Sequence, residues 1–187
     1  MEELYTVTWQ EALEFLKTGN KRYLLTGEPD MDASEKLRRR LVSDGQHPKA
    51  VVIACSDSRV VPEAVFGCSL GDIFTIRTAG NVIDSHQLGS IEYAVGHLHT
   101  SLVVLMGHTH CGAVGAAMHQ DSIGHIKPIT DEIKAAIGTE TDDVNASWLN
   151  VRWGVRKIQD VLEGREDVKV IGAMYDIETG EVTFEEE

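Results

Sequence analysis

The chain has 187 residues, with 17 basic and 30 acidic side chains and a formal net charge of −13 at pH 7. A hydrophobic fraction of 42% and a charged fraction of 25% are ordinary for a globular protein, and this length supplies one domain with a sizeable core. The acidic balance argues against nucleic acid and anionic membrane surfaces as partners, but it leaves room for a small anion in a locally positive pocket.

Two helices are predicted at the start of the chain. Residues 8–26 carry apolar side chains at roughly helical spacing, and Thr8 with Glu11 forms a capping box where they begin. Residues 34–44 are highly charged and form a short helix that stops before a glycine. We expect the two helices to form an N-terminal arm over residues 1–45.

Strands alternate with helices in the rest of the chain. Continuous apolar runs are typical of strands that are covered on both faces of a parallel sheet. The predicted strands are 49–54, 72–78, 102–107 and a pair around the turn 178–180. The predicted helices are 87–99, a helix that begins at residue 112, and 145–163. Residues 120–143 have a loop-like composition, which fits either a lid or an edge helix.

This order of elements predicts an α/β fold with right-handed crossovers. Its central β-sheet is mostly parallel and flanked by helices, with an N-terminal helical arm and a C-terminal edge strand. We expect a single domain over residues 1–187, in which residues 46–187 form the α/β core behind the arm.

Metal-binding side chains follow two of the buried strands. Cys55 comes directly after the first strand, and His108 and Cys111 follow 102–107 in the stretch GHTHCGA. Ligands of open parallel sheets bind outside the carboxyl ends of the strands, so these three side chains converge if their strands are near neighbours. Two thiolates and one imidazole are a zinc set that leaves the fourth position open. The sequence therefore predicts a catalytic rather than a closed structural zinc site.

The chain has three cysteines, an odd number, so they do not form a closed disulfide framework. Cys68 has no ligand-type neighbour and is expected to be a small buried hydrophobe. The same interpretation stays open as the alternative for Cys55 and Cys111. The opening MEELYTVTW lacks the basic and apolar segments of a secretory leader, and no apolar run approaches the ~20 residues of a membrane span. We expect a reducing, cytoplasmic location and no membrane partner.

The motifs around these residues carry a resemblance that covers nearly the whole chain. CSDSR at 55–59 and GHTHCG at 107–112, together with FTIRTAGN at 74–81, SIEYAV at 90–95 and the final GAMYDIETGEVTF, resemble the β-class carbonic anhydrases of the plant-like branch. The resemblance implies one Zn²⁺ per chain. It also implies a carbonate dehydratase, a lyase that reversibly hydrates CO2 to bicarbonate and a proton through a zinc-bound hydroxide.

The resemblance assigns further residues to the site. It implies that Asp57 pairs with Arg59 near neutral pH and orients the hydroxide, and strand-like alternation places both on the side of Cys55. It implies that the amide of Gln46 donates to the substrate oxygen. An ordinary surface ion pair and an ordinary loop residue are the competing interpretations.

Pocket residues and partners also follow from the resemblance. Phe74, Tyr93 and Ala79 are expected to line the substrate pocket, although both aromatic residues would otherwise be read as core. Arg77 matches one residue of a regulatory bicarbonate pocket found in another branch, but Val52 stands where that pocket has a tryptophan, so we expect no such pocket.

We expect a homodimer or a higher homo-oligomer, because in the resembling family such N-terminal helices embrace a partner. The apolar face of Trp9, Leu13 and Leu16 would then contact the second copy. Two other functions remain open, a COS or CS2 hydrolase on the same fold and a non-catalytic zinc-binding module. A dinucleotide enzyme is disfavoured because no G-x-G-x-x-G follows the first strand.

Overall fold

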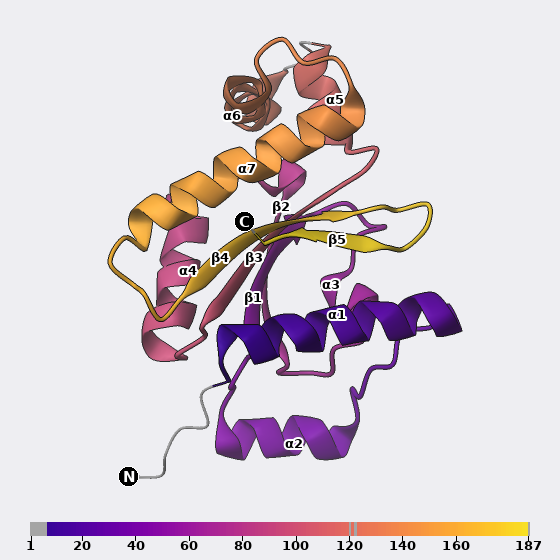
Figure 1. Ribbon diagram of the computed structural model, residues 1–187, viewed down its shortest axis with the longest axis vertical. Helices are drawn as coiled ribbons and strands as arrows, with labels where there is room; N and C mark the ends of the chain where they lie inside the picture. Colours follow the sequence, from indigo (N-terminus) through magenta and orange to yellow (C-terminus); the bar gives the residue numbers. More distant parts are fainter. Residues whose placement is uncertain (1–6, 120, 122, 187) are drawn as a thin grey trace.

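The computed structural model describes residues 7–119, 121 and 123–186, which contain a five-stranded sheet (Figure 1). The strands are β1 (Ala50–Cys55), β2 (Ile73–Thr78), β3 (Leu102–His108), β4 (Lys169–Tyr175) and β5 (Val182–Glu185). They lie in the order β2-β1-β3-β4-β5, and only the last pairing is antiparallel. The predicted α/β fold, with its mostly parallel sheet and C-terminal edge strand, is confirmed.

Helices cover both faces of this sheet (Figure 1). They are α1 (Trp9–Thr26), α2 (Glu35–Asp44), α3 (Pro62–Val65), α4 (Ser85–His97), α5 (Gly112–Met118), α6 (Lys127–Ile137) and α7 (Asp143–Val161), with short 3-10 helices η1 (Ala79–Asn81) and η2 (Gly124–Ile126). Within the described residues, no helix combines the length and the apolar character needed to cross a membrane.

The central strand β1 joins two layers of the core. Val52 packs in one layer with Leu13 and Leu16 of α1, whereas Val51 and Ile53 face the opposite layer with side chains of α4 and α7. This division follows from the alternation of side chains along a strand. All six residues of β1 and all seven of β3 are buried, so the carboxyl ends of these neighbouring strands are fixed to a rigid support.

The N-terminal arm differs from the expectation in one respect. Leu13 and Leu16 are 4% and 0% exposed because they pack on the sheet of their own chain. This face is therefore not free to cover a second copy. Helix α2 lies farther from the sheet (Figure 1) and buries Leu37 alone among its residues.

The loop-like segment 120–143 contains the helix α6. This helix packs against α5 and α7 and buries Ile133 and Ile137, which are one turn apart. The edge-helix interpretation of the segment is thus correct for residues 127–137. Ile129, Ile133 and Ile137 recur at helical spacing within residues 127–137, so the helix had a local sequence signal that the loop-like composition of the wider segment obscured.

Candidate metal centre

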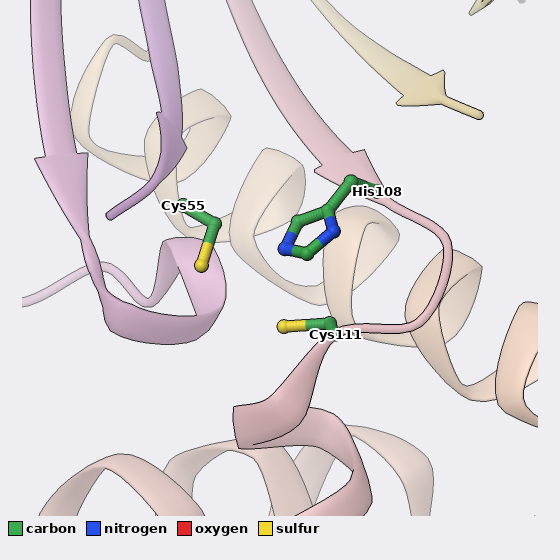
Figure 2. Close-up of side chains that lie close together, drawn as sticks. All are labelled: Cys55, His108 and Cys111. Atoms are coloured by element: carbon green, nitrogen blue, oxygen red, sulfur yellow. The ribbon is translucent and has the colours of Figure 1, made fainter. Parts of the chain in front are cut away.

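Three metal-binding side chains meet at the carboxyl end of the sheet (Figure 2). Cys55 ends β1, His108 ends β3, and Cys111 is the N-cap of α5. Their ligand atoms, two sulfurs and a ring nitrogen, all lie within 4.8 Å of one another. The residues are only 5%, 0% and 3% exposed, respectively. The geometry therefore gathers a compact, buried donor set from two strands and one helix start.

The His108 ring is oriented for a metal. Its Nδ1 lies 2.9 Å from the carbonyl oxygen of Thr109, and because a carbonyl only accepts, Nδ1 must carry the proton. The other nitrogen, Nε2, then presents a lone pair. It is buried and has no hydrogen-bond partner among the described residues. A buried imidazole nitrogen is rarely left unpaired, so this atom fits a metal ligand whose second nitrogen is held by the backbone.

The Cys55 sulfur is surrounded by donors. The backbone N–H of Gly80 donates to Sγ at 3.2 Å and that of Asp57 at 3.4 Å. The pKa of Cys55 is lowered to about 4, chiefly by a hydrogen bond from the Cys111 thiol and further by His108 and these N–H groups. Cys55 is therefore prepared to ligate as a thiolate.

Cys111 completes the donor set, and the pKa of its thiol shifts in the opposite direction from that of Cys55. The pKa of its thiol is raised, first because it donates to Cys55 and then because it is buried. The two sulfurs would repel each other if both were thiolates, which favours keeping one proton on the pair. A divalent cation between them relieves the same repulsion and displaces the proton, so this pair fits a metal as well as a shared hydrogen.

The Asp57–Arg59 pair lies beside this centre. Arg59 Nε donates to Asp57 Oδ1 at 3.0 Å and Nη2 donates to Oδ2 at 2.7 Å, a bidentate geometry. Arg59 holds the pKa of the Asp57 carboxyl well below its usual range. The proposed cause of their proximity was wrong, however. The strand stops at Cys55, and a turn follows in which the Arg59 N–H donates to Asp57 Oδ1 at 2.9 Å, so a turn and not strand alternation brings them together.

Comparison with known proteins identifies the family. Residues 50–182 match the protein family described as carbonic anhydrase, a stretch that includes all three clustered side chains. The chain belongs to this family. A carbonic anhydrase of Mycobacterium tuberculosis, named carbonic anhydrase 2, is 49% identical over 107 residues. That match covers 57% of this chain and 51% of the relative, so the chain spans about half the length of this curated relative.

Solved structures place the chain in the β class of carbonic anhydrases. The β-carbonic anhydrase CafA of Aspergillus fumigatus is 30% identical with a TM-score of 0.69, over 80% of this chain and 82% of that one. Tetrameric β-carbonic anhydrases of Sordaria macrospora give 27% identity and a TM-score of 0.70, over 80% of this chain and 86% of theirs. The resemblance first noted in the sequence motifs is therefore confirmed at the level of the β class.

Within this carbonic anhydrase fold, one of the remaining predicted residues lies near the cluster and three do not. Ala79 adjoins Gly80, whose N–H contacts the Cys55 sulfur. Gln46 precedes the amino end of β1, about 17 Å of strand away from Cys55 at its carboxyl end. The short distance in sequence between Gln46 and Cys55 did not reveal this separation in space.

The two aromatic residues form a separate group. The Phe74 and Tyr93 rings have centroids 6.3 Å apart, on the edge strand β2 and on α4. Phe74 pairs with Val51, whereas Cys55 pairs with Thr78 about 13 Å farther along the sheet. Tyr93 is 46% exposed. Within one chain, this pair does not line the metal centre.

Two other residues contribute to the centre without having been predicted to do so. Arg77 donates to the carbonyl oxygens of Cys55 at 3.0 Å and Asp57 at 2.6 Å, so it braces the end of β1. Asn150 of α7 donates to the carbonyl of Gly80 at 2.8 Å. Gly80 stood in the quoted FTIRTAGN motif, but a single asparagine on an apolar helical stripe carries no recognisable sequence signal.

Proposed function

We propose that the chain is a zinc-dependent carbonic anhydrase that reversibly hydrates CO2 to bicarbonate and a proton. The observation that carries this proposal is the unpaired, buried Nε2 of His108 beside the sulfurs of Cys55 and Cys111. Two sulfurs and one nitrogen suit Zn²⁺, with one ion per chain and one coordination position left open. Zinc bound there supplies a Lewis acid that makes water nucleophilic near neutral pH.

The residues around the donor set support a division of roles. Asp57 accepts a hydrogen bond from the attacking water and orients it towards CO2. Arg59 keeps the Asp57 carboxylate ionised and occupied, because both of its oxygens already accept hydrogen bonds from the guanidinium. In this proposal Asp57 stays off the metal near neutral pH. Ala79 contributes a small apolar wall, which suits a substrate without a dipole.

We also propose that the active enzyme is a homodimer or a higher homo-oligomer. The tetrameric β-carbonic anhydrases of Sordaria macrospora, which share this fold, support such an assembly. Gln46, Phe74 and Tyr93 lie away from their own metal centre, so any contribution they make to a pocket comes from a neighbouring copy. Three free cysteines suit a reducing compartment such as the cytoplasm.

The deciding experiment measures metal content and CO2 hydration on the same preparation. Zinc-loaded protein is expected to contain one zinc per chain and to release protons from CO2 faster than buffer in stopped flow. Sulfide release from COS or CS2 without CO2 hydration would favour the hydrolase on the same fold. Stoichiometric zinc with neither reaction would leave a non-catalytic zinc-binding module.

A further inference from the structure

One face of helix α7 contacts two backbone segments beside the candidate metal ligands, the turn at Gly80 and the loop between His108 and Cys111. Asp143 and Asn150 are seven residues apart, which is about two helical turns, so they share this face. Asn150 reaches the turn beside Cys55, and Asp143 reaches the loop between His108 and Cys111. A single helix thus contacts the backbone next to Cys55 and the backbone between His108 and Cys111, although these ligands come from separate strands.

The contact at Asn150 is buried and closely constrained. Asn150 is 4% exposed, and its Nδ2 donates to the Gly80 carbonyl at 2.8 Å. Gly80 has a φ of 65°, and a Cβ built on it would lie 2.7 Å from Ile133 Cδ1 and 3.0 Å from Ala113 Cβ. The turn therefore has little freedom to shift. Its N–H donates to the Cys55 sulfur at 3.2 Å, so Asn150 holds the very residue that stabilises this thiolate.

The contact at Asp143 acts on the other half of the centre. Asp143 Oδ2 accepts the backbone N–H of His110 at 2.9 Å. His110 has a φ of 56°, a left-handed conformation that a non-glycine residue keeps only when its surroundings hold it. Its carbonyl in turn accepts from Arg59 Nη2 at 3.2 Å. Asp143 thereby fixes the loop that joins His108 to Cys111 and steadies the guanidinium that pairs with Asp57.

We propose that Asn150 and Asp143 are positioning residues, which set the separation between Cys55 and the His108–Cys111 loop and so tune zinc affinity. The inference rests on the metal site of the proposed function. Within the described residues, neither side chain is hydrogen-bonded to a donor atom. Asn150 acts through one hydrogen bond to the backbone, and Asp143 acts through the His110 N–H, with its Oδ2 also 3.9 Å from the His110 Nδ1. Partners that orient metal ligands in this indirect way commonly change metal affinity by about 10–100-fold when they are removed.

The first test measures zinc affinity by competition with a chromophoric chelator. Asn150→Ala is expected to weaken zinc binding by about 10–100-fold, since the Gly80 turn loses its anchor. Asp143→Ala is expected to weaken it as well. Asp143→Asn keeps an acceptor oxygen for the His110 N–H and should restore affinity close to wild type, even though it removes the charge.

Two asparagines of the same chain supply matched controls. Asn145 lies on the exposed part of α7, so Asn145→Ala should leave zinc affinity unchanged. Asn20 of α1 is also 4% exposed, and its amide donates to the carbonyls of Val65 and Gly180. Asn20→Ala therefore removes a buried amide of comparable burial away from the donor set. It should lower the melting temperature without weakening zinc binding.

A spectroscopic readout separates positioning from general destabilisation. Co²⁺ bound in place of zinc is expected to show altered thiolate charge-transfer and ligand-field bands in Asn150→Ala, but not in Asn20→Ala. Unchanged zinc affinity and an unchanged Co²⁺ spectrum in Asn150→Ala would overturn the proposal. An equal loss of affinity in Asn20→Ala would overturn it too, because stability alone would then explain the effect.

Asp143→Ala carries the same test if Asn150→Ala does not fold, since Asp143 is partly exposed at the start of α7. These readouts use the metal alone. A chain that binds zinc but does not hydrate CO2 would defeat the proposed function and leave the positioning proposal open to the same measurements.

Discussion

Cys55 and Cys68 are both buried cysteines in the first half of the chain, but the pKa values of their thiols are shifted in opposite directions. Cys55 is 5% exposed and Cys68 is 0% exposed. Yet the pKa of Cys55 is lowered to about 4, whereas burial raises the pKa of Cys68 to about 12. Burial by itself therefore does not decide whether a thiol is reactive.

The difference comes from what surrounds each sulfur. The pKa of Cys55 is lowered chiefly by the neighbouring Cys111 thiol, and further by His108 and by the backbone N–H groups of Asp57 and Gly80 at the open end of the sheet. The Cys68 sulfur lies within the apolar layer under α1 and only donates, to the carbonyl of Phe66 at 3.8 Å. A thiolate needs donors to replace water, so the first site stabilises the anion and the second excludes it.

The largest expected effect follows from replacing a cysteine of the metal centre, with replacement of Cys68 as the comparison. Cys55→Ser and Cys111→Ser should abolish stoichiometric zinc binding and CO2 hydration, because the donor set then has only two strong ligands. Cys68→Ala should keep both and lose only about 1 kcal/mol of stability from reduced packing. Metal analysis and stopped-flow assays check this. Zinc loss in Cys68→Ala at unchanged folding would contradict the comparison.

A smaller effect is expected from the carboxylate beside Cys55. Asp57→Asn should lower kcat/KM for CO2 by about 10–100-fold while zinc remains bound, since the amide no longer pairs with Arg59 or accepts from water in the same way. The loss is measured by steady-state hydration kinetics at fixed zinc content. Activity equal to wild type would remove Asp57 from the proposed mechanism.

Thiol labelling compares the two cysteines directly. In zinc-free protein at pH 7, iodoacetamide should modify Cys55 at least about tenfold faster than Cys68, because the pKa of Cys55 is lowered and that of Cys68 is raised. Peptide mass spectrometry over a time course measures both rates. Added zinc should protect Cys55 and leave Cys68 as slow as before. Labelling of Cys68 as fast as, or faster than, that of Cys55 would contradict the lowered pKa of Cys55.

The smallest expected effect is on stability in alkali. The folded pKa of Cys68, about 12, lies above its ordinary value near 9, so the folded chain keeps a proton that the unfolded chain loses. The resulting stabilisation is fully present below pH 9 and is lost as pH rises towards 12.

Urea denaturation checks this linkage. The free energy of unfolding of wild type, relative to Cys68→Ala, should fall by about 1 kcal/mol between pH 9 and 10. Comparing the two proteins cancels groups that they share, such as Tyr175, whose pKa burial raises to about 12. A constant difference over this range would mean that Cys68 ionises normally in the folded chain.

Most of the fold was predictable because its strands have a strong local signal. The runs at 49–54 and 102–107 are apolar throughout, and both became central strands with every residue buried. Helix α6 was predicted only as one of two alternatives, although Ile129, Ile133 and Ile137 recur at helical spacing. Leu13 and Leu16 had the right pattern for a helix, but which surface they bury depends on where the sheet lies, and the sheet of the same chain covers them.

By itself, the sequence determined the donor chemistry. Cys55, His108 and Cys111 are identifiable because ligand-type residues directly follow apolar strands, and parallel strands end at one edge of a sheet. Only the tertiary structure decided how that chemistry is held. The hydrogen bond from Arg59 to the His110 carbonyl and the reach of α7 to Gly80 are contacts between segments that local sequence patterns do not connect. Their geometry exists only once the sheet and helices have packed.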